Sequence, residues 1–140
     1  MGVDPLSRSD RLLGGELTAA ISNAMVRIHR DYLGRGPTKA RTSIRENLVV
    51  VLMEDTFIKA ERSLITDGKH AEVLQTRHSF QMTMGRDMIG AIEELTGRTV
   101  VAFMSDNHID PDLACEIFVL EPEPVPDELT EAGDDGAVRR

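Results

Sequence analysis

The chain has 140 residues and a formal net charge of −8, with 41% hydrophobic and only 4% aromatic side chains. This length suits a single domain with a modest core, which aliphatic residues and seven methionines must fill. The acidic balance argues against electrostatic binding of nucleic acid, and the longest aliphatic run, Leu48 to Met53, is far too short to span a membrane.

The first predicted element is an amphipathic helix from about Glu16 to Leu33. Gly34 suits the left-handed residue that ends a helix, and Pro37 prevents the helix from resuming. Because the polar face is mixed in charge and the apolar face lacks Trp and Phe, we expect this helix to pack on a sheet rather than lie on a membrane. Its apolar stripe recurs at helical spacing: Leu17, Ile21, Ala24, Ile28 and Tyr32.

A β-hairpin is predicted next. Residues Thr38 to Arg45 alternate between small or apolar and polar side chains, the period of a half-buried strand. Glu46-Asn47 is the expected tight turn, and Leu48 to Met53 is the more fully buried return strand.

Two helices follow the hairpin. A short one is predicted from Phe57 to about Thr66, with Asp55 or Thr56 as its N-cap. A longer one runs from about Lys69 to Thr96, with Gly97 in the expected C′ position. Its apolar stripe consists of Val73, Phe80, Met84, Met88 and Leu95.

The long helix has unusual interior residues. Gly85 and Gly90 each cost roughly 1 kcal/mol relative to alanine, and we expect them to permit close packing or a kink. His78 shares a face with Leu74 and Gln81, where a partly buried histidine is expected.

A second hairpin closes the domain. We predict a strand over Thr99–Met104, a loop over Ser105–Asp112 and a strand over Leu113–Leu120. The element order α-ββ-αα-ββ predicts an α+β fold, in which about three helices pack on one face of an antiparallel sheet of about four strands.

The domain boundaries follow from composition. Residues 1–14 are expected to be a flexible N-terminal segment, residues 15–121 the folded domain, and residues 122–140 a disordered acidic tail. Residues 121–140 hold seven acidic and two basic side chains. The single cysteine, Cys115, cannot form an intrachain disulfide and fits a cytoplasmic protein.

The order of these segments resembles the MpsC family, small bacterial proteins described as part of a sodium-translocating, membrane-potential-generating system and long catalogued as a domain of unknown function. The resemblance covers about residues 15–121. It is carried by six segments: Tyr32–Pro37, Leu48–Leu52, Ala60–Leu64, Ile92–Arg98, Ser105–Asp106 and Ile117–Glu121.

The resemblance implies a context rather than a mechanism. Proteins of this kind are similar to soluble companions of a cation or inorganic-carbon transport system, whose membrane subunit resembles an antiporter module. The family provides no catalytic residues to transfer to this chain.

Metal and catalytic candidates are few. Acidic side chains at alternate positions can converge on a hard cation, but the segment 106–112 lacks the central glycine and the terminal glutamate of an EF-hand. Its Asp, Asn and Pro residues are also typical of a hairpin loop, which we favour. The four histidines have no zinc-like spacing, and Cys115 fits an inert buried thiol. We therefore predict no catalytic residue, no cofactor and no metal site. The remaining metal candidates are Asp106, Asp110 and Asp112.

The densest basic cluster surrounds the first predicted strand. A phosphate loop would precede a helix, whereas Gly34-Arg35-Gly36-Pro37 follows one, so these glycines indicate a turn. Three interpretations of the cluster are open: a solvated face, an anionic-ligand site, or a docking strip for an acidic partner. Because exposed charged side chains usually serve only to solvate a surface, we favour the solvated face. The candidate partner- or anion-binding residues are Arg35, Lys39, Arg41 and Arg45.

Three functional hypotheses follow. The first is a non-catalytic accessory or regulatory protein, expected to be a cytoplasmic homo-oligomer that reaches the membrane through a transporter subunit. The second is a soluble sensor that binds an anion or ligand on the basic strand. The third is a small enzyme with an unrecognised site, against which the missing nucleophile–base pair counts.

Overall fold

The computed structural model describes residues 14–122. The expected N-terminal segment and acidic tail lie outside the described residues, except for Gly14 and Pro122. The elements, in chain order, are α1 (Gly14–Leu33), β1 (Lys39–Arg45), β2 (Leu48–Glu54), α2 (Lys59–Thr66), α3 (His70–Thr96), β3 (Val100–His108) and β4 (Leu113–Leu120).

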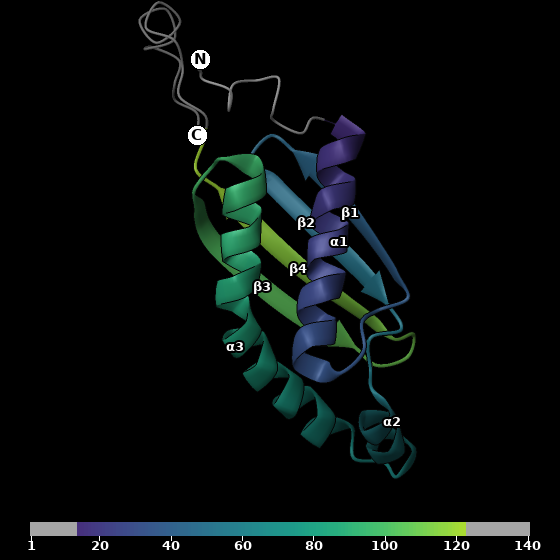
Figure 1. Cartoon of the computed structure of the whole chain (residues 1–140). Coiled ribbons are helices and arrows are strands. Elements are labelled where there is room, and N and C mark those ends of the chain that lie inside the picture. Colours follow the sequence, from purple (N-terminus) through teal and green to yellow (C-terminus); the bar gives the residue numbers. More distant parts are fainter. Residues whose placement is uncertain (1–13, 123–140) are drawn as a thin grey trace, which may run out of the picture.

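The predicted α+β architecture is confirmed. The two hairpins form one antiparallel sheet with the strand order β1-β2-β4-β3, so the second strands of the two hairpins pair at its centre. Figure 1 shows α1 and α3 lying side by side across one face of this sheet, and α2 beyond the end of the sheet, where it contacts α3.

The core lies between these two helices and the sheet. Alternate residues of β2 and β4 point toward the helices and are buried, which is the period-two pattern of a sheet covered on one side. Four methionines from three elements fill much of the space, as the shortage of aromatic residues requires. They are Met25, Met53, Met84 and Met88, each with no exposed surface.

Both predicted glycine stops at helix ends are confirmed. Gly34 has a φ of 89° and Gly97 a φ of 70°, and each amide donates to a carbonyl four residues earlier. The first helix packs on the sheet as expected, with the Ser22 and Thr42 hydroxyl oxygens 2.7 Å apart.

The predicted cap of the short helix was wrong. The helix begins at Lys59, and its N-cap residue is Ile58, whose amide donates to the Glu61 carboxylate at 2.8 Å. A glutamate three residues into the helix therefore satisfies the free amide, and neither Asp55 nor Thr56 is the cap.

The predicted loop over Ser105–Asp112 was half wrong. Strand β3 continues to His108 and pairs with β4 up to that residue, with one irregularity in the register between Val100 and Ala102. The polar residues of this stretch alternate between the two faces of the sheet. Asn107 lies on the helix-facing side, where its side-chain oxygen accepts a hydrogen bond from Gln81.

The burial predicted on α3 was also partly wrong. His78 is exposed, whereas Arg77 and Gln81 are buried. The reason is the helical phase. Arg77 and Gln81 continue the line from Val73 to Met84, and His78 is turned away from it.

Candidate functional site

One face of the sheet is not covered by any element within residues 14–122, and we call it the open face (Figure 1). It consists of the odd-numbered residues of β1, the even-numbered residues of β2, the odd-numbered residues of β4, and the even-numbered residues of β3 from 102 to 108. The Ser22–Thr42 contact fixes this phase, because Thr42 points to α1 and its strand neighbours must point away.

The centre of the open face is apolar. Val50 and Leu52 on β2 lie beside Ile117 and Cys115 on β4, and all four are half-buried by their neighbours. Farther out, 40% of Leu48 and 51% of Met104 are exposed. Because soluble domains seldom leave the middle of a sheet apolar and uncovered, this face has the character of a contact surface.

Three of the four predicted basic candidates border this surface. Lys39, Arg41 and Arg45 are exposed side chains on the outer strand β1 and point to the open face. Arg41 lies 3.9 Å from Glu54, a solvated contact that contributes little to stability. Lys39 and Arg45 form no ion pair with any other described residue.

Arg35 does not belong to this row. Its guanidinium donates to the carbonyl oxygens of Asp55 and Phe57 at 2.9 and 3.0 Å, and to the Asp55 carboxylate at 2.9 Å. Arg62 approaches the same carboxylate. Partial desolvation alone would raise the pKa of Asp55, but Arg35 and Arg62 hold it below its usual value. Arg35 therefore ties the end of α1 to the segment that follows β2.

The three acidic metal candidates do not converge. Asp106 lies on the open face of β3, whereas Asp112 accepts hydrogen bonds from the Thr56 amide at 3.0 Å, the Thr56 hydroxyl at 2.9 Å and the Phe57 amide at 3.1 Å. Asp110 lines a cavity of about 420 Å³ together with Asp112. Within residues 14–122 no three His, Cys, Asp or Glu side chains are grouped to hold a metal ion.

Cys115 is half-buried on the open face. Burial raises the pKa of its thiol, and the negative charges of Glu116 and Asp106 raise it further. A raised pKa keeps the thiol protonated at neutral pH and makes it a poor nucleophile, which agrees with the expectation of an inert cysteine.

A buried histidine–glutamate contact was missed from the sequence. His29 on α1 and Glu116 on β4 are both buried, and His29 Nε2 lies 3.6 Å from Glu116 Oε2. His29 Nδ1 donates to the Met25 carbonyl at 2.8 Å, since a carbonyl only accepts. Neither Glu116 oxygen has a hydrogen-bond partner among the described residues. The signal was available, because Glu116 occupies an inward position between Ala114 and Phe118.

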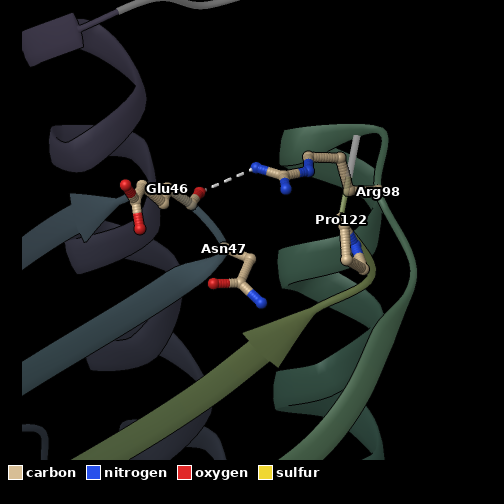
Figure 2. Close-up of a pocket in the computed structure, with 4 residues that line it drawn as sticks. All are labelled: Glu46, Asn47, Arg98 and Pro122. Atoms are coloured by element: carbon tan, nitrogen blue, oxygen red, sulfur yellow. Dashed lines mark hydrogen bonds between the residues drawn. The ribbon is translucent and has the colours of Figure 1, made fainter. Parts of the chain in front are cut away.

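The cavity in Figure 2 lies where the β1–β2 turn meets the start of β3 and the end of β4. It has a volume of about 420 Å³ and is lined by Glu46, Asn47, Arg98 and Pro122. Arg98 donates to the Glu46 carbonyl at 3.0 Å and the Glu121 carbonyl at 3.1 Å, and Asn47 donates to the Leu120 carbonyl at 3.2 Å. These donors already hold the two hairpins together, so the cavity is a structural junction.

A family model described as "Na+-translocating membrane potential-generating system (MpsC)" matches residues 14–122. No curated protein and no solved structure matches the chain significantly. Among the described residues, no helix has the length and apolar character needed to cross a bilayer.

Proposed function

Because the chain belongs to the MpsC family, we propose that it is a non-catalytic accessory or regulatory protein of a Na⁺-translocating, membrane-potential-generating system. In this proposal it works in the cytoplasm and reaches the membrane by binding a transport subunit. The observation that carries the proposal is the family match over residues 14–122.

The use of the polar side chains supports a binding role over catalysis. Asp112 accepts hydrogen bonds from the amides and the hydroxyl of the segment before α2. Glu61 accepts from the Ile58 amide and from Arg77. Arg98 donates to the Glu46 and Glu121 carbonyls. Groups with these roles hold the fold together and are not free to move protons or bind substrate.

Lys39 and Arg45, the two ends of the basic row on β1, are the contact that we assign to an acidic partner. Lys39 and Arg45 project from the exposed outer strand β1, and neither lines the cavities beside Arg98, beside Arg62 or beside Arg27. Small anions are usually held in a concave site, whereas an exposed row of like charges suits a macromolecular surface of opposite charge. This geometry favours a protein partner over the anion-sensor alternative.

An affinity capture from native, detergent-solubilised membranes tests the proposal. The full-length chain is compared with Lys39→Ala/Arg45→Ala and with the matched control Lys59→Ala/Arg30→Ala, whose exposed side chains lie on the helices. We expect a cation-transport subunit to be recovered by the wild type and the control, and at least tenfold less by the β1 variant.

Two outcomes contradict parts of the proposal. Failure of the wild type to recover a membrane transport subunit would overturn the accessory role. Equal recovery by all three proteins would keep that role and overturn the assignment of the contact to β1.

A further inference from the structure

On the open face, the outer strand β1 carries three cationic side chains and the other outer strand, β3, carries one carboxylate, Asp106. The strand pairing places Arg41, Leu52, Cys115 and Asp106 in one row across the sheet, with Arg41 on β1 and Asp106 on β3. Three strand spacings, roughly 14 Å of backbone, separate these two residues, which is too far for an ion pair within one chain. Asp106 forms no ion pair with any described residue.

A second copy of this chain complements the face. Two copies that stack face to face about a two-fold axis have two aligned choices. If the axis runs across the strands, each strand lies opposite itself, and the basic row of β1 meets a second basic row. If the axis runs parallel to the strands, β1 lies opposite β3 of the second copy, and β2 lies opposite β4.

Only the second arrangement places a cation of β1 opposite a carboxylate on the facing strand. Because Arg41 and Asp106 occupy the same row, each Arg41 then faces Asp106 of the other copy, and the contact occurs twice. Packed sheets lie about 10 Å apart, a gap that an extended arginine and an aspartate bridge together. The same arrangement places Val50 opposite Ile117 of the second copy and covers the apolar centre. Lys39 and Arg45, at the two ends of the outer strand, then lie at the rim of the contact, where the acidic partner of the proposed function can still reach them.

We infer that this protein is a homodimer in which two open faces pack about a two-fold axis parallel to the strands, with Arg41 of each copy paired to Asp106 of the other. The arrangement with the axis across the strands is disfavoured because it places the cations of β1 opposite each other. The outer strands therefore set the orientation of the two copies, and the apolar centre supplies most of the attraction.

The test measures the mass of the purified full-length chain by sedimentation velocity and light scattering between about 1 and 100 µM, a range that runs from a micromolar dissociation constant to about a hundredfold above it. We expect twice the chain mass of 15.5 kDa. Ile117→Glu places a charge in the centre of the interface and should give a monomer. The control Met82→Glu changes a side chain that is 65% exposed on α3 and should remain dimeric.

A charge exchange tests the orientation of the two copies. Arg41→Asp and Asp106→Arg should each weaken the dimer at least tenfold, and the double variant should regain an affinity within about threefold of the wild type, because it recreates the pair with its signs reversed. Both residues are exposed, so these variants remain informative even if Ile117→Glu fails to fold.

Each unfavourable result overturns a defined part of the inference. A wild-type chain that is still monomeric at 100 µM would exclude the dimer, because this concentration is about two orders of magnitude above a micromolar dissociation constant. A folded Ile117→Glu variant that remains dimeric would show that the interface lies elsewhere. A double variant as weak as the single ones would exclude the proposed axis. The purified chain is measured alone, so these results are independent of whether a transport subunit is captured.

Discussion

Arg77 on α3 and Glu61 on α2 form a bidentate ion pair that is almost completely buried. Arg77 Nε lies 2.7 Å from Glu61 Oε2, and Arg77 Nη2 lies 2.9 Å from Glu61 Oε1. The same guanidinium also donates to the Thr56 carbonyl and lies 5.1 Å from the centre of the Phe57 ring. One side chain therefore joins both helices to the segment that leaves β2.

Replacing Arg77 should strongly destabilise the fold. Arg77→Met leaves the Glu61 carboxylate buried without its cation, and we expect the free energy of unfolding in urea to fall by about 3–5 kcal/mol. Arg77→Lys should lose less, because it keeps the charge but not the two-pronged geometry. Arg86→Met, at an exposed position of the same helix, should change stability by less than about 0.5 kcal/mol. A loss below about 1 kcal/mol in Arg77→Met would show that the pair is not a structural tie.

Replacing Glu116 should stabilise the fold, in contrast to replacing Arg77. Its carboxylate is fully buried and neither oxygen accepts a hydrogen bond from a described residue, so Glu116→Leu should raise the free energy of unfolding by about 1–3 kcal/mol. The matched control is Glu93→Leu, which removes a carboxylate that accepts from the Val100 amide at 2.9 Å and should cost about 1–2 kcal/mol. Urea unfolding of both variants checks the contrast, and a destabilised Glu116→Leu would contradict it.

The two glycines inside α3 should respond differently to alanine. A Cβ at Gly85 would lie 3.0 Å from the Phe103 ring, whose centroid is 5.2 Å from that of Phe118, whereas a Cβ at Gly90 would meet nothing within 4 Å. Gly90→Ala should therefore gain about 1 kcal/mol from helix propensity. Gly85→Ala should gain nothing or lose stability, because the close contact offsets the same gain. Thermal unfolding compares them, and equal gains would contradict a required close approach at Gly85.

Lowering the pH should remove the contribution of Asp55 to the free energy of unfolding. The folded-state pKa of this carboxyl is lower than its ordinary value of 3.8, so its stabilisation is fully present above that value and is lost as the pH falls through the folded pKa. Asp55→Asn removes the charge, and asparagine tolerates the φ of 62° at this position. We expect the variant to be less stable than the wild type at pH 7 and the difference to shrink as the pH is lowered below 4, a range set by the ordinary pKa. Urea midpoints measured across this range test the expectation, which a constant difference would contradict.

Motif residues that carried the family resemblance have structural roles. Arg35 and Arg62 hold Asp55, Glu61 holds the Ile58 amide and Arg77, and Arg98 joins the two hairpins. These residues are polar and scattered along the chain. From the sequence they fit ordinary turns and helix ends, and their shared task becomes visible only when their partners are known.

Local patterns in the amino-acid sequence are enough to predict the order of the helices and strands and the fold class. Each of these patterns depends only on residues that are close in the sequence, because it reflects local sterics or the burial of one face. They are the 3.6-residue apolar stripe of α1, the alternation of β4, and the glycines after α1 and α3. The length of β3 was missed because pairing with β4, and not local preference, extends it through polar residues.

The burial of polar groups and the grouping of residues on one surface depend on contacts between segments that are distant along the chain. Arg77 can be buried because Glu61, distant along the chain, is brought beside it, and the same packing places Glu116 beside the buried His29. Arg41 and Asp106 fall in one row because β2 pairs with β4 in a particular register. Register between hairpins depends on the whole packed core, and a shift by one residue would move every side chain to the other face.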